Sequence, residues 1–192
     1  MTAVILAGGQ GRRMGGKDKG LLAWGGRPLI ETILDTIKPQ VGHILINANR
    51  NKEKYTNYGY PVVADNLDGY QGPLAGFVAG MKAAKTDYIT TIPCDSPLIP
   101  ADMFERLSAA LIDEQAELAV AHDGQRLQPV YALLPVKLLD SLLQFMGEGN
   151  RKIDLWYARH KMAVADFSDK PEIFRNVNTP EQHSELHAEV VG

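Results

Sequence analysis

Short runs of apolar residues alternate along the chain with longer segments in which apolar residues recur every three or four positions. The short runs are rich in Val, Ile, Leu and Ala, and several break directly into glycine or polar residues. This pattern is typical of strands buried in a parallel sheet. The predicted strands are residues 2–6, 43–47, 61–64, 88–92, 118–121, 129–134 and 163–167.

The longer segments have the spacing of one apolar helix face. The predicted helices are residues 28–37, a segment ending near 84, 101–116, 136–146, 151–159 and a last one that starts at 179. Strands that alternate with helices in this order predict an α/β fold of three α/β/α layers, with a mostly parallel sheet. The short link at Asp123-Gly124 predicts that the strands on either side of it pair antiparallel.

Polar residues follow the ends of the first four predicted strands. Leu6 leads into a glycine-rich loop, and Asn47, Asp65 and Asp95 stand at or just after the ends of the next three strands. In an open parallel sheet, ligands bind beyond the carboxyl ends of the strands. We therefore expect these residues to converge on one site.

The loop after the first strand combines glycines with positive charge. Glycine allows backbone N–H groups to approach a ligand closely, and cations meet an anion there. The cations of the loop are Arg12, Arg13, Lys17 and Lys19. The loop therefore predicts a phosphate-rich ligand.

Two known phosphate motifs nearly match this loop. Residues 11–17 have the spacing of a P-loop, but Asp18 stands where a hydroxyl should ligate magnesium, and its charge would repel phosphate. The dinucleotide fingerprint that Gly9 begins would place its third glycine on Met14. A solvated surface loop is the other interpretation, and it is disfavoured because a strand end, several glycines and four cations coincide.

Composition narrows the class of protein. A chain of 192 residues, 45% hydrophobic and 22% charged, is expected to form one domain over residues 1–192. A net charge of -3 argues against general nucleic-acid binding. The one cysteine, Cys94, excludes an intramolecular disulfide, and no signal peptide or membrane span is predicted. We therefore expect a cytoplasmic protein without nucleic-acid or membrane partners.

The motifs resemble a known family. Residues of the glycine-rich loop and its flanks resemble the signature of nucleotidyltransferases, which join a nucleoside triphosphate to a phosphorylated acceptor. That signature is Leu6-Ala-Gly-Gly, Arg13-Met-Gly15, Lys19 and Leu21-Leu22. With later blocks, the whole chain is similar to the molybdenum cofactor guanylyltransferases. These blocks are Asn47-Ala-Asn-Arg50, Asp65, Gly72-Pro-Leu-Ala-Gly76, Cys94-Asp-Ser-Pro97 and Asn176-Val-Asn-Thr-Pro180.

The resemblance implies a Rossmann-like nucleotidyltransferase fold and transfer of GMP from GTP to the terminal phosphate of molybdopterin, with pyrophosphate released and Mg2+ as cofactor. It assigns GTP to about residues 1–100 and the pterin side in part to about 101–192. An acceptor phosphate is already an anion, so positioning and electrostatics suffice without a strong general base. Other implied partners are further molybdenum cofactor biosynthesis proteins and recipient molybdoenzymes or their chaperones, and a monomer is expected.

The resemblance also implies roles for individual residues. The implied catalytic residues are Arg13, Lys19 and Asp95, of which Asp95 is the magnesium ligand. The implied GTP-binding residues are Leu6, Ala7, Gly8, Gly9, Arg13, Lys19, Asn47, Asp65, Gly72 and Asp95. The implied pterin-binding residues are Arg151, Asn176 and Asn178.

Structural alternatives stand beside these roles. Asp95 could form an Asx turn or cap a helix, Asn47 and Asp65 could cap strand ends, and Arg151 could be a solvated charge at a helix end. Asp18 departs from a purely basic loop. Whether it points away from the site, pairs with an arginine or tunes the site stays open.

Two other functions also stay open. One is a cytidylyltransferase that acts on molybdopterin or another phosphorylated acceptor, since the glycine-rich loop reads the base largely through its backbone. The other is a non-catalytic carrier that binds GTP or the pterin. Such a carrier would bind nucleotide without releasing pyrophosphate.

Overall fold

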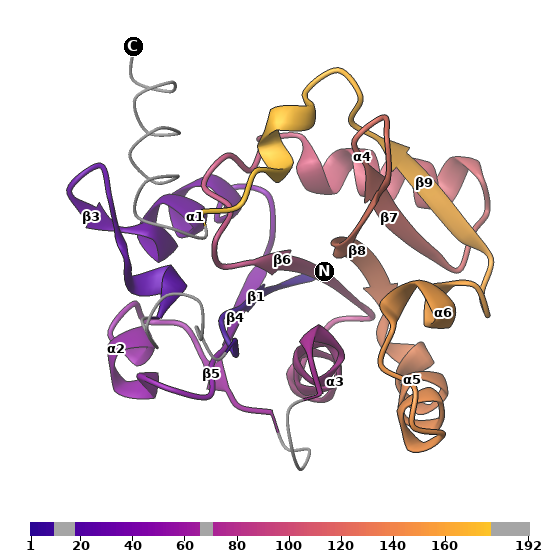
Figure 1. Cartoon of the computed structure of the whole chain (residues 1–192), viewed down its shortest axis with the longest axis horizontal. Helices are drawn as coiled ribbons and strands as arrows, with labels where there is room; N and C mark the ends of the chain where they lie inside the picture. Colours follow the sequence, from indigo (N-terminus) through magenta and orange to yellow (C-terminus); the bar gives the residue numbers. More distant parts are fainter. Residues whose placement is uncertain (10–17, 66–70, 178–192) are drawn as a thin grey trace.

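A seven-stranded sheet runs through the centre of the molecule in the computed structural model, which describes residues 1–9, 18–65 and 71–177 (Figure 1). Its strands are β1 (Thr2–Leu6), β4 (His43–Asn47), β5 (Val62–Val63), β6 (Tyr88–Pro93), β7 (Leu118–His122), β8 (Leu127–Pro135) and β9 (Met162–Asp166). They stand in the order β5-β4-β1-β6-β8-β7-β9. A separate ribbon consists of β2 (Ala23–Trp24) and β3 (Arg27–Pro28).

The central sheet is mostly parallel. β1 lies between β4 and β6 and is parallel to both, β5 is parallel to β4, and β9 is parallel to β7. Within the described part of this central sheet, β8 alone is antiparallel to both of its neighbours, β6 and β7. The predicted sheet is confirmed, including the antiparallel pair across Asp123-Gly124, and each predicted strand is present with small shifts at its ends.

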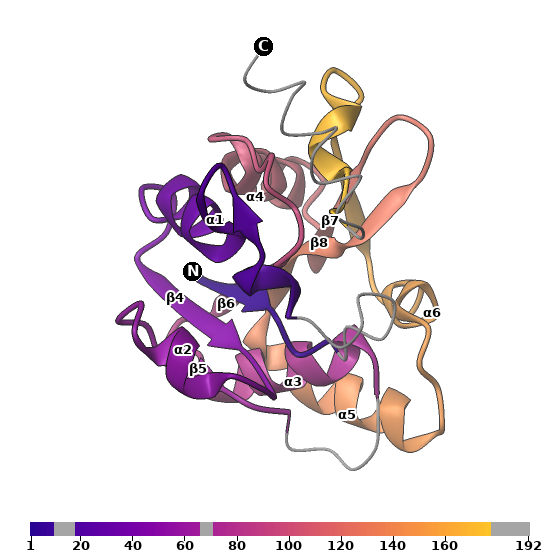
Figure 2. The ribbon, with the colours of Figure 1, turned by 60° about the vertical axis from the view of Figure 1, so that its left-hand side comes forward.

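Helices cover both faces of the sheet. They are α1 (Leu29–Ile37), α2 (Lys52–Thr56), α3 (Pro73–Ala83), α4 (Met103–Asp113), α5 (Leu139–Gly147) and α6 (Ile153–Tyr157), with single turns η2 (Lys19–Leu21), η3 (Val136–Leu138) and η4 (Pro171–Phe174). α1 and α4 lie on one face, and α3, α5 and α6 lie on the other (Figures 1 and 2). The predicted three layers are confirmed, whereas the helix predicted from 179 falls outside the described residues.

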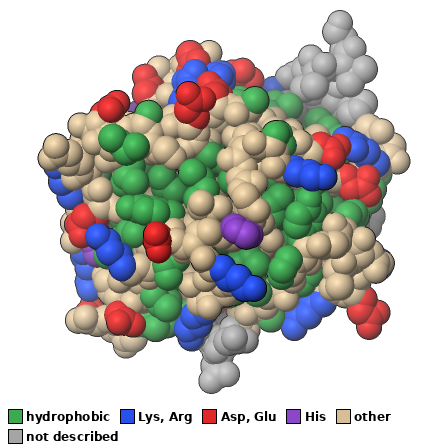
Figure 3. Space-filling model, turned by 180° about the vertical axis from the view of Figure 1, so that it is seen from behind, with side chains coloured by type: hydrophobic (Ala, Val, Ile, Leu, Met, Phe, Trp, Pro, Cys, Tyr) green, Lys and Arg blue, Asp and Glu red, His purple; other side chains and the backbone are tan. Residues whose placement is uncertain are grey.

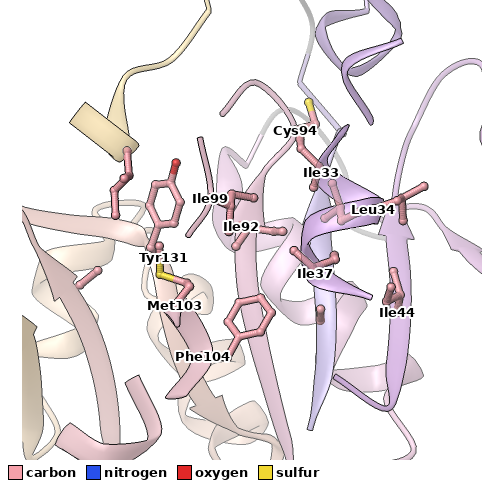
Figure 4. Packing of buried hydrophobic residues seen from close by; sticks show 14 of the residues in the cluster. Ile33, Leu34, Ile37, Ile44, Ile92, Cys94, Ile99, Met103, Phe104 and Tyr131 are labelled. Atoms are coloured by element: carbon pink, nitrogen blue, oxygen red, sulfur yellow. The ribbon is translucent and has the colours of Figure 1, made fainter. Parts of the chain in front are cut away.

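The alternation of side chains along each strand divides the core into two apolar clusters. Ala3 and Ile5 of β1 face the cluster under α1 and α4, while Val4 between them faces the cluster under α3 and α5. Figure 4 shows Ile37 of α1 beside Ile92 of β6 within the first cluster. Each such aliphatic side chain, once buried, stabilises the fold by about 2 kcal/mol.

Helix α3 lies unusually close to the strands because it presents two glycines to them. A Cβ at Gly76 would stand 2.6 Å from Leu6 Cδ2 and 2.6 Å from Asn47 Oδ1, and one at Gly80 would stand 2.8 Å from Val4 Cγ2. Contacts that short do not occur, so larger residues would push the helix away. The two glycines therefore allow the start of α3 to pack directly against the carboxyl ends of β1 and β4.

The surface seen from behind carries apolar, acidic and basic side chains interspersed with one another (Figure 3). Charges of both signs are mixed there rather than gathered into a field of one sign. Within the described ranges, no helix is both long enough and apolar enough to cross a membrane.

Candidate active site

The carboxyl ends of four parallel strands meet at one edge of the sheet. Leu6 at the end of β1 is in register with Asn47 on one side and with Pro93 on the other, and Asn47 is in register with Val63. The segments that follow these strands therefore emerge side by side. The expected convergence of the polar strand ends is seen at this edge.

A network of amides and one carboxylate lies beyond β4 and β5. Asn47 Nδ2 donates to Asp65 Oδ1 at 2.9 Å, and Asn49 Nδ2 donates to Asp65 Oδ2 at 2.7 Å. The Asp65 backbone N–H in turn donates to Asn49 Oδ1 at 2.9 Å. Both carboxylate oxygens of Asp65 are thus held by amide donors, which fixes the carboxylate beside the glycine-rich loop.

The start of the glycine-rich loop is bound to this network. The Ala7 N–H donates to the Asn47 carbonyl at 2.8 Å, Asn49 Nδ2 donates to the Gly8 carbonyl at 3.1 Å, and Arg50 donates to the Gly9 carbonyl at 3.0 Å. A Cβ at Gly8 would stand 2.9 Å from Asn49 Nδ2, so a larger residue there would displace the amide. Glycine at position 8 therefore allows the loop backbone and the network to touch.

An ion pair joins the far end of the loop to the end of β6. Lys19 on η2 places its Nζ 2.7 Å from Asp95 Oδ2, and the two side chains are 26% and 11% exposed. The pair brings a cation and a carboxylate, 76 positions apart in the chain, to the edge where Asn47 and Asp65 lie. Such a pair can neutralise an anionic ligand and hold a cation beside it.

Cys94, next to Asp95, is buried and its thiol is held protonated. Burial raises the pKa of Cys94 far above its usual range, and the nearby charges of Asp95 and Asp18 raise it further. A protonated buried thiol is a poor nucleophile, and it packs as a small apolar group. Figure 4 shows the side chain at the edge of the core cluster.

The donor set at this edge fits a hard divalent cation held in part by a ligand. Within residues 1–9, 18–65 and 71–177, no three His, Cys, Asp or Glu residues form a cluster that could hold a metal. Mg2+ commonly takes only one or two carboxylates, and phosphate and water oxygens complete its coordination. Asp95 offers such a carboxylate, in which Oδ2 accepts from Lys19, whereas both oxygens of Asp65 accept hydrogen bonds from amides.

The segment after η4 reaches the end of β6 from the C-terminal side. Ser96 Oγ donates to Asn176 Oδ1 at 2.7 Å, and the Val177 N–H donates to the Asp95 carbonyl at 2.8 Å. Asn176 is thus adjacent to the Lys19–Asp95 pair. Asn176, which was predicted on the pterin side, thus lies next to Asp95, which was predicted as the magnesium ligand.

The remaining predicted residues are more dispersed. Gly72 directly precedes α3, and Arg151 stands between α5 and α6, where it donates to the carbonyls of Met146 and Asn150. Among the hydrogen bonds of the described ranges, none links Arg151 to Asn176 or Asp95. Arg13 and Asn178 lie outside the described residues.

Several residues of this edge were not predicted as site residues. Asn49 and Arg50 lie in the block Asn47-Ala-Asn-Arg50, which carried the family resemblance. The sequence did not indicate that these two side chains, as well as Asn47, contact the site, where they donate to the carbonyls of Gly8 and Gly9. Ser96 likewise lies in the block Cys94-Asp-Ser-Pro97, whereas Tyr55 carried no signal of its own, because a tyrosine in a polar segment is common. Their place follows only from the packing of α2 and the turn after β6 against the loop.

Comparison with known proteins gives a consistent result. Residues 3–163 match the family described as MobA-like NTP transferase domain. The molybdenum cofactor guanylyltransferase of Shewanella sediminis (strain HAW-EB3) is 55% identical over 186 residues, covering 97% of this chain and 95% of that protein. That of Shewanella sp. (strain MR-4) is 53% identical over 190 residues, covering 99% and 96%.

Solved structures show the same fold. Molybdopterin-guanine dinucleotide biosynthesis protein A from Archaeoglobus fulgidus superposes with a TM-score of 0.81 at 20% identity, covering 100% of this chain and 99% of that one. The 4-diphosphocytidyl-2C-methyl-D-erythritol synthase from Anaerococcus prevotii reaches 0.78 at 14% identity, with coverage of 100% and 96%. The predicted nucleotidyltransferase fold and the predicted resemblance to molybdenum cofactor guanylyltransferases are confirmed.

Proposed function

The chain belongs to the MobA-like NTP transferase family, and we propose that it transfers GMP from GTP to the terminal phosphate of molybdopterin. The relatives named as guanylyltransferases support the choice of nucleotide and acceptor. The observation that carries the proposal for this site is the Lys19–Asp95 pair at the edge of the sheet, beside the Gly8 backbone and the Asp65 network. This arrangement suits a triphosphate with a divalent cation.

In the proposed reaction, an oxygen of the molybdopterin phosphate attacks the α-phosphorus of GTP. The bond from that phosphorus to the bridging oxygen breaks, and pyrophosphate leaves with the electron pair. Arg13 and Lys19 hold the triphosphate, and their charge opposes the build-up of negative charge at the reacting centre. Mg2+ held by Asp95 would supply further charge neutralisation when it is bound.

The other residues of the edge bind and orient the substrates. The Leu6–Gly8 backbone contacts the guanine, and the Asn47–Asp65 network keeps that backbone in place. On the acceptor side, Asn176 and Asn178 hold the pterin, with Arg151 as a counter-charge to its phosphate. Asn176 fits this role because its oxygen is held by Ser96, which leaves its N–H groups for an anionic acceptor.

The proposal is tested by incubating the protein with Mg2+, molybdopterin and either labelled GTP or labelled CTP. We expect the guanine dinucleotide product and one pyrophosphate per product with GTP only. Transfer from CTP alone would overturn the choice of base. Nucleotide binding without pyrophosphate release would support the carrier instead.

Asp95→Asn is the sharpest single variant, because it keeps the size of the side chain and removes the charge that holds the metal. We expect the rate of transfer to fall about a hundredfold or more, because stabilisation of the transition-state charge is lost. Thermal unfolding should stay near that of the wild type, and Asp113→Asn, an exposed site on α4, serves as the matched control. Full activity of Asp95→Asn would contradict the metal role.

The proposal also covers the setting of the reaction. The dinucleotide product is passed to recipient molybdoenzymes or their chaperones in the cytoplasm, in contact with other molybdenum cofactor biosynthesis proteins. The working form is a monomer, which light scattering of the purified protein would report as 21.1 kDa. A mass of twice that value would contradict it.

A further inference from the structure

Asp18 is a buried carboxylate directly before Lys19. Only 8% of the residue is exposed, although its neighbours in the chain include several cations of the glycine-rich loop. A buried carboxylate is costly unless hydrogen-bond donors satisfy it. The hydrogen-bond donors around Asp18 therefore explain why a carboxylate stands at this position, although its negative charge would repel phosphate.

Both oxygens of Asp18 accept hydrogen bonds from α2 and its N-cap residue. Tyr55 Oη donates to Asp18 Oδ1 at 2.5 Å, and Asn51 Nδ2 donates to Asp18 Oδ2 at 3.1 Å. Burial, and then the negative charge of Asp18, raise the pKa of Tyr55 far above its usual range, so its hydroxyl keeps the proton that it donates. The hydrogen bonds of Asp18 thus fasten it to α2 rather than to a ligand.

The turn that follows Asp18 is wedged between the same tyrosine and the end of β6. Gly20 is buried, and a Cβ there would stand 2.7 Å from Tyr55 Oη and 3.3 Å from Cys94 Cβ. The Gly20 backbone also bonds to Cys94. Lys19, between Asp18 and Gly20, is therefore held from both sides, and its side chain reaches Asp95.

We propose that Asp18 is a positioning residue that anchors η2 to α2, so that Lys19 is presented to Asp95 and to the triphosphate, an inference that rests on the proposed function. Asp18 acts through Lys19 and touches no substrate. The carboxylate accepts from both donors at once through two charge-assisted hydrogen bonds. An amide can pair with both only by donating its own NH2 group to one of them, and both bonds are then neutral and weaker.

The first test measures the anchor without any substrate. In η2, the Leu21 and Leu22 N–H groups donate to the carbonyls of Asp18 and Lys19. We expect Asp18→Asn and Tyr55→Phe each to speed amide exchange at these two positions about tenfold, the factor that corresponds to loss of one hydrogen bond to a charged group. Exchange in β1 should not change. Unchanged exchange at Leu21 and Leu22 would overturn the anchor.

The second test asks whether the anchor serves the reaction. We expect both variants to raise KM for GTP about tenfold, the factor that corresponds to loss of one hydrogen bond to a charged group, and to leave KM for molybdopterin unchanged. In a Lys19→Ala background, Asp18→Asn should have no further effect on KM for GTP. Additive effects of the two changes would overturn action through Lys19.

Comparing Asp18→Asn with Tyr55→Phe also distinguishes the anchoring role of Asp18 from a direct effect of its charge on GTP binding. Tyr55→Phe removes the hydrogen bond but keeps the Asp18 charge, so tighter GTP binding in Asp18→Asn with no change in Tyr55→Phe would overturn the proposal. Tyr58→Phe is the matched control, because its hydroxyl bonds to Glu31 instead. If the wild type transfers no GMP, the proposed function fails, while the exchange rates still decide the anchor.

Discussion

At the scale of single residues, the Asn47 side chain links three elements of the proposed site. Its Nδ2 donates to Asp65 at 2.9 Å and to the Val63 carbonyl at 3.3 Å. Its Oδ1 lies 2.6 Å from where a Cβ on Gly76 would stand and 3.0 Å from where one on Gly8 would stand. The amide therefore keeps its orientation only while position 76 is glycine.

This constraint predicts that Gly76→Ala impairs GTP binding through Asn47. The new methyl group would stand 2.6 Å from Asn47 Oδ1, so the amide must shift and its bond to Asp65 is lost. We expect KM for GTP to rise about tenfold, because the lost bond belongs to the network in which Asp65 holds Asn49 and Asn49 holds the Gly8 carbonyl. The free energy of unfolding should fall by about 1–3 kcal/mol, as for other overpacked core sites.

Gly80→Ala is the matched control in the same helix. Its methyl group would stand 2.8 Å from Val4 Cγ2, away from the strand ends. We expect a similar loss in the free energy of unfolding, measured by urea titration, with KM for GTP unchanged. Equal changes in KM for the two variants would show that α3 acts on binding only through overall stability.

The single residues of the site were predicted in part. Asn47, Asp65, Lys19 and Asp95 could be assigned from the family resemblance, and the structure brings all four to one edge. The orientation of Asp18 could not be predicted, because its partner Tyr55 lies 37 positions further on and its place depends on how α2 packs. Spacing along a chain carries no information on such contacts.

At the scale of elements, α4 is fastened to the segment after β9 by a group of charged side chains. Asp102 at the start of α4 accepts from Lys170 Nζ at 2.9 Å and from Arg106 Nε at 2.8 Å. Arg106 also donates to both oxygens of Asp169 and lies over the Phe167 ring. The group holds the chain that leads into η4, and η4 leads to Asn176.

The Asp102 carboxylate predicts a dependence of stability on pH. Burial alone would raise the pKa of Asp102, but hydrogen bonds and charge from Lys170 and Arg106 outweigh it and lower the pKa. A group whose pKa is lower in the folded state stabilises that state above its unfolded pKa, near 3.9, and loses this contribution as the pH falls through the folded value.

Asp102→Asn should therefore reduce the free energy of unfolding at pH 7 by about 1 kcal/mol, a value limited by the partial exposure of the group. The difference from the wild type should shrink as the pH falls below about 4 and vanish at lower pH. Urea titrations at several pH values measure it, with Asp113→Asn at the other end of α4 as a control. A difference that grows toward acid would contradict the assignment.

The strands and helices were largely predictable because each buries an apolar run or face. Departures occur where packing sets the ends. The helix predicted over 136–146 begins as the single turn η3, and the Val136 N–H, which would have no partner inside a helix that starts there, donates to the Asp87 carbonyl. The sequence left α2 undecided between helix and loop, because the segment is polar. In the structure, Tyr55 is the one buried residue among the five of α2.

At the scale of the whole molecule, the C-terminal part of the chain completes the edge that the N-terminal part builds. Ser96 follows β6 in the parallel half of the sheet, and its partner Asn176 lies 80 positions later, beyond β9. The Val177 N–H donates to the Asp95 carbonyl, so the same peptide contacts the proposed metal ligand. The sequence predicted both halves of the site but not this direct contact between them.

This contact predicts that Ser96→Ala separates the two substrates kinetically. The substitution removes the hydroxyl that holds Asn176 Oδ1 at 2.7 Å and leaves the Lys19–Asp95 pair in place. We expect KM for molybdopterin to rise about fivefold, the factor that corresponds to about 1 kcal/mol for one neutral hydrogen bond, and KM for GTP to stay the same. Steady-state kinetics with each substrate varied in turn measures both constants.

Ser108→Ala removes a serine hydroxyl of the same kind, one that bonds within α4 to the Phe104 carbonyl, and should change neither constant. If Ser96→Ala raised KM for GTP instead, Asn176 would act on the nucleotide side, and the division of the site between the two parts of the chain would be wrong. A rise in KM for molybdopterin alone places the acceptor against the segment after η4. The phosphate of the acceptor would then approach GTP from the side of Asp95 on which Asn176 lies.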